Sequence, residues 1–329
     1  MKTVLFSSFA TDDIAAALAA HGEVRRVDDP GALVAALDGA DALVMSNPGL
    51  YTAGFADEVC RRGGALRWIQ LLSAGYDGPL AHGVPEGVVL ANAGDAWSPT
   101  VAEHALALLL GLLRRLPESQ GAQQKRQWAA TSIRPLLGSV EGRTVAILGF
   151  GSIGREIAAR LRPFGARTVG LTRSGRPAAI EPRPDLMAPV SQLHDILRGA
   201  DALIVTVPMS AATRHIVDAA ALACLPAHAV VVNVSRGGTV DGVALANALH
   251  DGRLAGAALD VTDPEPLPES DPLWSAPNLI ITPHVAGFGS AALAVRLRAL
   301  VAENARRFVA RQPLLHRVEV KVRTIGNQT

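Results

Sequence analysis

Short apolar runs alternate with helix-like segments in the first part of the chain. The runs typical of buried strands cover residues 3–6, 24–27, 42–45 and 68–71. Between them, apolar positions recur at helical spacing over residues 14–20, 31–37 and 55–62. Strands that alternate with helices in this way are typical of a parallel sheet with helices on its faces. This part of the chain therefore predicts an α/β domain.

A second alternation of the same kind begins at Arg143 and extends to about Pro283. Its predicted strands cover residues 145–148, 168–171, 202–207, 230–233, 257–259 and 279–281. Its predicted helices cover residues 154–162, 190–197, 219–224 and 242–251. About six strands are expected of a full dinucleotide-binding fold. The stretch 175–189 holds four prolines and is predicted to be a surface loop.

Two further helices are predicted on either side of this second alternation. One covers residues 99–116, with Pro99 in its first turn and Ser98 as a candidate N-cap. The other covers residues 290–311. We infer that the chain leaves its first domain, completes the second and then returns. The predicted fold class is α/β with two doubly wound parallel-sheet domains. The second domain, residues 99–289, is predicted to be inserted in the first, residues 1–98 and 290–329.

The composition agrees with two α/β domains and excludes several kinds of partner. Apolar residues make up 49% of the 329 residues, and the net charge of +1 favours neither nucleic acid nor an anionic membrane surface. Cys60 and Cys224 form no disulfide framework or metal cluster, so we expect buried thiols. The apolar run 3–10 is short for an export signal and is followed by acidic residues, so we expect a cytoplasmic protein. The apolar helix 101–113 is too short to span a bilayer.

A glycine-rich turn follows the first strand of the second alternation. It reads Gly149-Phe150-Gly151-Ser152-Ile153-Gly154 and leads into a predicted helix. Between a strand and a helix, this spacing is typical of a dinucleotide-binding turn. Gly149 would permit the tight turn, Gly151 would let the backbone approach a pyrophosphate, and Gly154 would let the helix pack on the strand. The helix N-terminus would then face the anion with free N–H groups.

The end of the next strand bears on which dinucleotide binds. An NAD site usually places a carboxylate there for the ribose 2′-hydroxyl. This chain has Thr172-Arg173-Ser174 instead, with no acidic residue from 171 to 176. The guanidinium of Arg173 matches a 2′-phosphate, and the two hydroxyls can add hydrogen bonds. We therefore expect NADP(H) to be preferred, with NAD(H) as the alternative; a solvated surface arginine is the other interpretation of Arg173.

Three polar residues follow later strands in a fixed order. Arg236 lies in VNVSRGG, Glu265 in LDVTDPEPLP and His284 in ITPHVAG. In these residues the chain resembles the D-isomer-specific 2-hydroxyacid dehydrogenase family, over essentially its whole length. The resemblance rests also on Ser73-Ala-Gly-Tyr-Asp77, Thr100-Val-Ala-Glu-His-Ala105, Val207-Pro208 with Thr213, Asn233-Val-Ser-Arg-Gly237 and Pro272-Leu-Trp274. An isolated histidine or Arg–Glu pair would more often be structural, but the ordered set with a glycine turn is specific.

The chemistry of 2-keto acid reduction needs these residue types. The reaction places a hydride on C2 and a proton on the carbonyl oxygen. A histidine titrates near neutral pH and can supply the proton, and the resemblance implies this role for His284. A neighbouring carboxylate would hold the ring and favour the imidazolium form, and the resemblance implies this role for Glu265. Arg236 would bind the substrate carboxylate and polarise the carbonyl.

The resemblance implies that residues 99–289 form a Rossmann cofactor domain, inserted in a flavodoxin-like substrate domain of residues 1–98 and 290–329. It also implies the other binding positions. Backbone N–H groups at Ala74, Gly75 and Tyr76 would bind the substrate carboxylate, together with Arg236 and His284. Asp260 would contact the nicotinamide end of the cofactor. The expected cofactor-binding residues are Gly149, Phe150, Gly151, Ser152, Ile153, Gly154, Thr172, Arg173, Ser174, Val207, Pro208, Thr213, Val234, Ser235, Arg236, Asp260, His284 and Gly287. No metal site is expected.

Several bulky or polar residues have both a functional and a structural interpretation. Leu50, Tyr51, Trp97 and Phe288 are candidates for an apolar wall around a substrate side chain, or for ordinary packing. For Glu103 and His104 on the long helix, packing near a dimer interface or hinge is favoured. The helix 101–113 has more apolar surface than one small domain is expected to cover. We therefore expect a homodimer, with Trp128 as a residue that could reach the partner.

These observations predict NADPH-dependent reduction of a small 2-keto acid to the D-2-hydroxy acid. Glyoxylate and hydroxypyruvate are the expected kinds of substrate. A member of the same family that oxidises formate or phosphite is one alternative, and would need no pocket for a substituent on C2. A cofactor-sensing co-regulator is another, from a different functional class. The complete set of Arg236, Glu265 and His284 argues for turnover instead.

Overall fold

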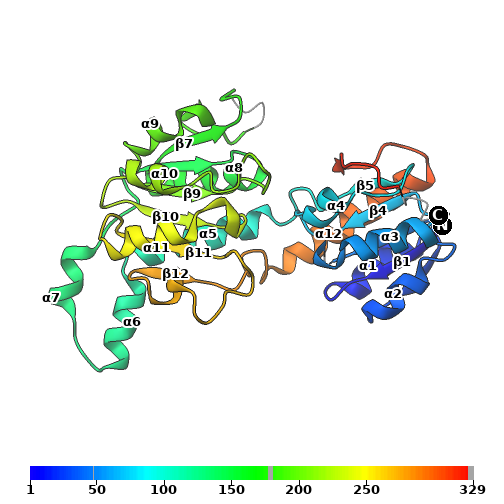
Figure 1. Ribbon diagram of the computed structural model, residues 1–329, viewed down its shortest axis with the longest axis horizontal. Coiled ribbons are helices and arrows are strands. Elements are labelled where there is room, and N and C mark those ends of the chain that lie inside the picture. Colours follow the sequence, from blue (N-terminus) through cyan, green and yellow to red (C-terminus); the bar gives the residue numbers. More distant parts are fainter. Residues whose placement is uncertain (47, 177–180, 325–329) are drawn as a thin grey trace. The chain divides into compact units, whose positions relative to one another are not determined.

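The computed structural model describes residues 1–46, 48–176 and 181–324. The chain forms two compact units (Figure 1). The first consists of Met1–Trp97 and Gly289–Thr329, and the second of Ser98–Phe288. The second unit is thus inserted in the chain of the first. The assignment of these units to substrate and cofactor stays a prediction.

The first unit is built on a mainly parallel sheet. Its strands are β1 (Lys2–Phe6), β2 (Glu23–Arg26), β3 (Ala42–Met45), β4 (Trp68–Leu71), β5 (Val89–Ala91) and β13 (Arg317–Val318). They are arranged in the order β13-β5-β4-β3-β1-β2, and only β13 pairs antiparallel, with β5. Without β13 this is the 2-1-3-4-5 order of flavodoxin-like folds. The doubly wound fold expected from the sequence is therefore confirmed for this unit.

Helices cover this sheet, and their starts follow from local capping. They are α1 (Thr11–Ala19), α2 (Pro30–Ala36), α3 (Ala53–Arg62), α4 (Asp77–His82) and α12 (Ala291–Val309), with a 3₁₀ turn η1 (Pro48–Leu50). The side chains of Asp29 and Thr52 accept hydrogen bonds at the starts of α2 and α3. α12 packs against α1, and its Phe308 lies 5.6 Å from the buried ring of Trp68. The C-terminal helix therefore completes the core of the first unit.

The second unit contains a seven-stranded parallel sheet in its described part. The strands are β6 (Thr144–Leu148), β7 (Arg167–Thr172), β8 (Leu186–Pro189), β9 (Ala202–Val205), β10 (Val230–Asn233), β11 (Gly256–Leu259) and β12 (Leu279–Ile281). Their order is β12-β11-β10-β9-β6-β7-β8, the 3-2-1-4-5-6 order of dinucleotide folds with one added strand. The prediction of a surface loop over residues 175–189 was wrong at the end of this range, because residues 186–189 form β8, which pairs with β7. An edge strand tolerates its proline.

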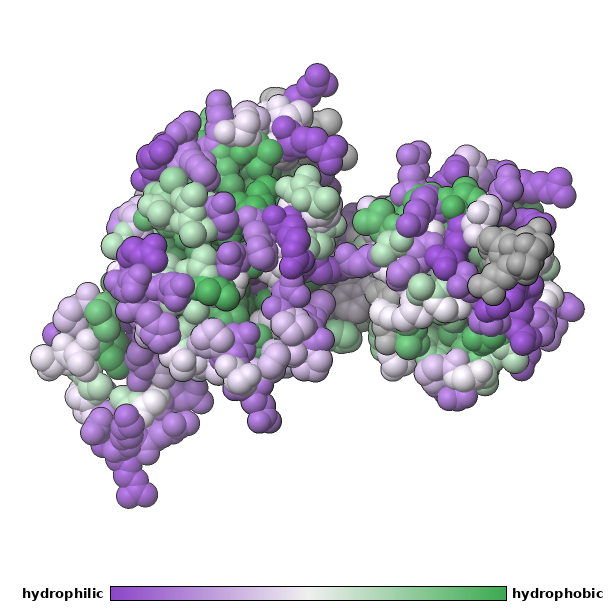
Figure 2. All heavy atoms as spheres, in the orientation of Figure 1, coloured by the Kyte–Doolittle hydropathy of each residue, from purple (hydrophilic) through white to green (hydrophobic). Residues whose placement is uncertain are grey.

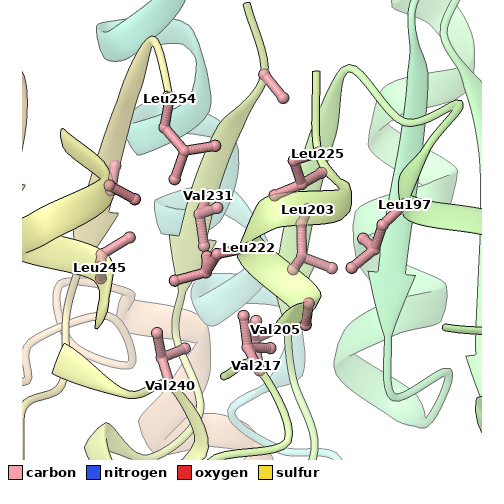
Figure 3. Packing of buried hydrophobic residues seen from close by; sticks show 14 of the residues in the cluster. Leu197, Leu203, Val205, Val217, Leu222, Leu225, Val231, Val240, Leu245 and Leu254 are labelled. Carbon is pink, nitrogen blue, oxygen red and sulfur yellow. The ribbon is translucent and has the colours of Figure 1, made fainter. Parts of the chain in front are cut away.

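Most helices of the second unit contribute buried residues to its core. The helices of this unit are α5 (Ser98–Leu113), α6 (Leu116–Gln124), α7 (Ala130–Ile133), α8 (Ser152–Leu161), α9 (Leu193–Leu197), α10 (Ala219–Cys224) and α11 (Gly242–His250). Short 3₁₀ turns are η2 (Arg134–Leu136), η3 (Arg162–Phe164), η4 (Val190–Gln192), η5 (Gly237–Thr239) and η6 (Pro272–Ser275). Figure 3 shows Leu222 from α10 and Leu245 from α11 packed over Val231 of the sheet. This core fixes the strand ends that carry the candidate site.

The long helix α5 differs from its expectation in two respects. It begins at Ser98 and ends at Leu113, and Arg115 then adopts a left-handed φ of 53° before α6. Its apolar residues, including Leu109 and Leu112, are buried against α8, β10 and β11 within the second unit. The expectation that α5 leaves an uncovered apolar face was therefore wrong, because the sheet of its own unit covers that face.

α6 and α7 instead extend away from the sheet of the second unit (Figure 1). Side chains on this extension remain exposed, with Trp128 at 96% and Leu116 at 57%. Figure 2 shows hydrophobic residues among hydrophilic ones on this part of the surface. No helix in the described ranges is long and apolar enough to cross a membrane. Cys60 and Cys224 are free and partly buried.

Candidate active site

The glycine turn lies between β6 and α8. Gly149 has a φ of +97°, and a Cβ at this position would lie 2.8 Å from the backbone nitrogen of Val207. A Cβ at Gly154 would lie 2.5 Å from the carbonyl oxygen of Gly149. Around Gly151, by contrast, the space where a Cβ would point is open to beyond 4 Å. The turn thus combines two tight backbone contacts with one open approach at a helix N-terminus. This cradle fits a pyrophosphate.

The neighbouring residues hold this turn in place. The Thr206 hydroxyl, just after β9, donates to the carbonyl of Gly149. Phe150 is buried, and its ring fills the space that a side chain at Gly170 of β7 would need. β6 and β9 adjoin at the point where the strand order reverses, which is where open α/β sheets bind ligands. The predicted residues Val207, Pro208 and Thr213 belong to the segment that follows β9, where Thr213 donates to the Pro208 carbonyl at 2.6 Å.

The end of β7 forms a tight turn with two exposed arginines. The Thr172 hydroxyl oxygen accepts from the N–H of Gly175 at 3.0 Å, and the Ser174 hydroxyl accepts from the N–H of Arg176 at 3.4 Å. Arg173 and Arg176 are exposed. The nearby acidic residue Asp185 cannot serve this turn, because it accepts from Thr168 at the start of β7. The turn therefore presents cations and hydroxyls.

Arg236 lies on a turn that a buried asparagine fixes. Asn233, at the end of β10, donates to the Arg236 carbonyl at 3.0 Å and accepts from the hydroxyl of Ser235 at 2.7 Å. Thr239 donates to the same carbonyl at 2.6 Å. A Cβ at Gly237 would lie 1.9 Å from the backbone after β11, so only glycine fits there. The backbone of Arg236 is consequently held by buried polar groups that sequence reasoning did not single out.

His284 and Glu265 form a hydrogen-bonded pair. Nδ1 of His284 lies 2.8 Å from a carboxylate oxygen of Glu265. The other Glu265 oxygen accepts from the backbone N–H of Thr262 at 3.0 Å, which orients the carboxylate. Both side chains are about half exposed, so the ring can reach a ligand. His284 and Glu265, which are 19 positions apart in the sequence, thus lie in direct contact, and their catalytic roles stay a prediction.

The charges around this pair set its protonation. The hydrogen bond to Glu265 has the largest effect on the pKa of His284 and raises it. Burial of the ring and, to a smaller extent, the charge of Arg236 oppose this increase, but the pKa of His284 remains raised. Burial raises the pKa of Glu265, but the hydrogen bond from His284 and nearby positive charges outweigh it, so its pKa is lowered. Both directions favour an imidazolium beside a carboxylate. The pair therefore stabilises the protonated ring, which is the form that can donate a proton.

The turn that carries His284 is held by the carboxylate of Asp260. This side chain is 1% exposed. Its oxygens accept from the backbone N–H groups of Val285 at 2.9 Å and Ala286 at 3.0 Å, and from the Thr282 hydroxyl at 2.6 Å. The N–H of His284 donates to the Asp260 carbonyl at 2.7 Å. Asp260 thus supports the turn, and a direct contact with the nicotinamide stays a prediction.

His104 also belongs to this network. Its Nε2 lies 3.1 Å from the Thr282 hydroxyl and 3.5 Å from Asp260. Sequence reasoning favoured a packing role at an interface or hinge for this residue. The histidine was visible within a family motif, but its partners lie more than 150 residues away in the chain, so no local signal could identify them.

The predicted substrate loop of the first unit follows β4. The Asn92 side chain donates to the carbonyl of Ala74 at 2.7 Å, and the Ser73 hydroxyl donates to that of Gly75 at 2.7 Å. Tyr76 then precedes α4. These bonds shape a loop at the carboxyl end of a strand, where such sheets bind ligands. Asn92 was not singled out from the sequence.

Two of the candidate wall residues have structural roles. Tyr51 is 1% exposed and packs in the core of the first unit, with its ring 5.6 Å from that of Phe55. The Trp97 indole donates to the Leu72 carbonyl at 2.7 Å and packs edge-on against Phe9. The ordinary packing interpretation therefore holds for these two side chains. Leu50 is half-buried against the same core as Tyr51, and Phe288 is 56% exposed.

A glycine turn at the switch point of a parallel sheet, with a histidine–glutamate pair at later strand ends, is typical of a dinucleotide-dependent oxidoreductase. The sequence profile "D-isomer specific 2-hydroxyacid dehydrogenase, NAD binding domain" matches residues 106–286. The chain therefore belongs to the D-isomer-specific 2-hydroxyacid dehydrogenase family, as its motifs predicted. It is an oxidoreductase with an NAD(P)-binding domain.

Individual relatives agree with this membership. A glyoxylate reductase of Thermococcus kodakarensis is 34% identical over 272 residues, 79% of this chain and 80% of that protein. A crystal structure of a family member from Aeromonas salmonicida has a TM-score of 0.84 and 29% identity, and the match covers 97% and 98% of the two chains. An NADPH-dependent glyoxylate/hydroxypyruvate reductase of Sinorhizobium meliloti, solved with NADP and malonate, has a TM-score of 0.77 and 30% identity over 98% and 99%.

Proposed function

We propose that this 2-hydroxyacid dehydrogenase reduces a small 2-keto acid, such as glyoxylate or hydroxypyruvate, to the D-2-hydroxy acid with NADPH. The observation that carries the proposal is the 2.8 Å bond between His284 and Glu265 on the unit with the glycine turn. The Thermococcus and Sinorhizobium relatives, which are named for glyoxylate or hydroxypyruvate reduction, support the substrate class. When bound, the nicotinamide supplies the hydride.

The chain's own residues supply the proton and the orientation. His284, held as an imidazolium by Glu265, donates its proton to the carbonyl oxygen as the hydride reaches C2. Arg236 binds the substrate carboxylate through its planar fork of donors and stabilises the developing negative charge. The Asn233 network fixes the backbone of Arg236, and the Asp260 network fixes that of His284. The backbone positions from which both side chains extend are thus fixed by buried polar groups.

The two units divide the binding roles in this proposal. The second unit binds the cofactor through its glycine turn, the turn after β7 and the residues that follow β9, β10 and β12. The first unit binds substrate through backbone N–H groups of Ala74, Gly75 and Tyr76. The loop bonds from Asn92 and Ser73 support this role, because they fix the backbone without using its N–H groups.

The preference for NADPH rests on the turn after β7. Arg173 is exposed there and can reach a 2′-phosphate, and the hydroxyls of Thr172 and Ser174 lie in the same turn. No carboxylate stands at residues 171–176 to repel the phosphate. The structure of the Sinorhizobium relative with NADP supports this assignment.

A panel assay tests the proposed function. The purified chain is mixed with NADPH or NADH and with glyoxylate, hydroxypyruvate, pyruvate or 3-phosphohydroxypyruvate, and nicotinamide absorbance is followed. We expect oxidation of NADPH with a small 2-keto acid and a product of D configuration where C2 is chiral. Tight NADPH binding without oxidation by any 2-keto acid would overturn the proposal. Reduction of NADP by formate or phosphite would point to the other chemistry.

Glu265→Gln should move the pH dependence of reduction to lower pH. The proton donor must be charged, so the rate falls as pH rises through the pKa of His284. Glu265 raises that pKa. Without its carboxylate, the ring loses its proton at lower pH, and the decline in kcat begins earlier. The pH profile of kcat for both proteins measures this, and coincident profiles would remove Glu265 from this role.

We also propose that the chain forms a homodimer through the α6–α7 extension. Ala122, Trp128, Ile133 and Leu137 line an apolar groove of about 580 Å³ on it. Such an exposed apolar surface is typical of a subunit interface. Light scattering should give a mass near twice the 34.2 kDa of one chain. Trp128→Asp should lower it toward one chain, whereas a monomer mass for the unmodified protein at all concentrations would contradict the dimer.

A further inference from the structure

The imidazole of His104 enters the His284 network from a separate helix. α5, which carries it, packs against β10 and β11. The side chain of His104 is 22% exposed, and its Nε2 lies 3.1 Å from the hydroxyl of Thr282. The same nitrogen lies 3.5 Å from Asp260. His104 on α5 thus contacts the residues that hold the turn carrying His284.

The chemistry of the three groups fixes the direction of their hydrogen bonds. Asp260 accepts from two backbone N–H groups, and its carboxylate has no proton to offer. Thr282 must therefore donate its single hydroxyl proton to Asp260, over 2.6 Å. The Thr282 oxygen can then only accept from His104. Nε2 of His104 consequently carries a proton, and the chain of donors runs from His104 through Thr282 to Asp260.

This chain of donors ends on the backbone that presents His284. Asp260 binds the N–H groups of Val285 and Ala286, the two residues after the catalytic histidine. His284 itself has a φ of +55°, a left-handed conformation that L residues adopt at a cost. The turn keeps this conformation because Asp260 holds its N–H groups, and the orientation of Asp260 depends in turn on Thr282.

We propose that His104 is a positioning residue for His284, acting by hydrogen bonding through Thr282 and Asp260. The inference rests on the proposed role of His284 as proton donor. It replaces the packing role that the sequence favoured. A packing role needs only the volume of the ring, whereas a positioning role needs a donor at Nε2. Substitutions that keep one property and lose the other separate the two.

His104→Phe and His104→Gln are the matched variants. Phenylalanine keeps the ring volume but cannot donate, and glutamine places a donating amide near the position of Nε2. We expect His104→Phe to lower kcat by about 10- to 100-fold, with the substrate KM and NADPH affinity little changed, because misplacement of a catalytic group costs this much. His104→Gln should stay within about threefold of the unmodified protein. Glu103→Ala, exposed on the same helix, is the control and should leave kcat unchanged.

A second measurement needs neither cofactor nor turnover. The imidazole signal of His284 is titrated by NMR in the free protein and assigned by its loss in His284→Gln. The groups that face this ring are Glu265, Arg236 and Asp260. In His104→Phe the imidazole of His284 should be held less well against Glu265. The pKa of His284 should therefore fall toward the ordinary value of histidine. His104→Gln and Glu103→Ala should titrate like the unmodified chain.

The outcomes distinguish the inference from the proposed function. A His104→Phe variant with full kcat and an unchanged His284 titration overturns the positioning role. Loss of activity in His104→Gln but not in His104→Phe shows packing and overturns it as well. If the unmodified chain reduces no 2-keto acid, the proposed function fails. The NMR titration then still decides whether His104 positions His284.

Discussion

His284→Ala is expected to lower the rate of 2-keto acid reduction by about 10²–10⁴-fold, the range typical for loss of a general acid. NADPH affinity should stay within a few fold, because the glycine turn and the turn after β7 are formed by other residues. Single-turnover absorbance measurements and fluorescence titration with NADPH give the two quantities. His250→Ala removes an exposed histidine at the end of α11 and should change neither.

The size of this effect follows from the position of His284. Its Nδ1 is occupied by Glu265, so Nε2 is the nitrogen left to serve substrate. Alanine leaves water as the proton source, without orientation. It also leaves Glu265 without its partner, which is why the double variant with Glu265→Gln should be little worse than His284→Ala alone. Retained turnover in His284→Ala would mean that the proton comes from another group.

Arg173→Asp should reverse the cofactor preference. Loss of a charge-assisted partner is worth about 1.5–3 kcal/mol, or roughly ten- to a hundredfold in NADPH affinity. The new carboxylate would also repel the 2′-phosphate and accept from the ribose hydroxyls of NADH. Fluorescence titrations with NADPH and NADH measure both changes. We expect NADPH to bind more weakly and NADH more tightly than to the unmodified protein.

A charge-matched control separates local contact from a general field effect. Arg253 lies just before β11, at the amino end of a strand, whereas ligands bind at carboxyl ends. Arg253→Asp changes the net charge equally and should leave the cofactor preference intact. The role of Arg173 is refuted if the unmodified chain binds both cofactors equally, or if Arg253→Asp and Arg173→Asp behave alike.

The sequence predicted most of the elements that present the site. The bounds of β3, β4, β10, β12 and α10 were predicted to the residue, because each is a short run that consists mostly of apolar residues. The elements that were missed have weaker patterns. β8 lies in a proline-rich stretch, and β13 has only two residues. β8 forms by pairing with β7, the strand before it, and β13 by pairing with β5, which lies far earlier in the chain.

Some residues of the candidate site could likewise be predicted from the sequence, and others only from the structure. Residue type and order along the chain made the glycine turn, Arg173, Arg236, Glu265 and His284 the candidates, because chemistry limits which residues can bind a phosphate, bind a carboxylate or transfer a proton. The supports of these residues depended on tertiary structure. Asn233 under Arg236 and His104 beside Asp260 are ordinary polar residues until a partner is known. Packing of α5 on the sheet brings His104 to Thr282 across 178 positions, a contact that no local pattern of hydrophobic residues encodes.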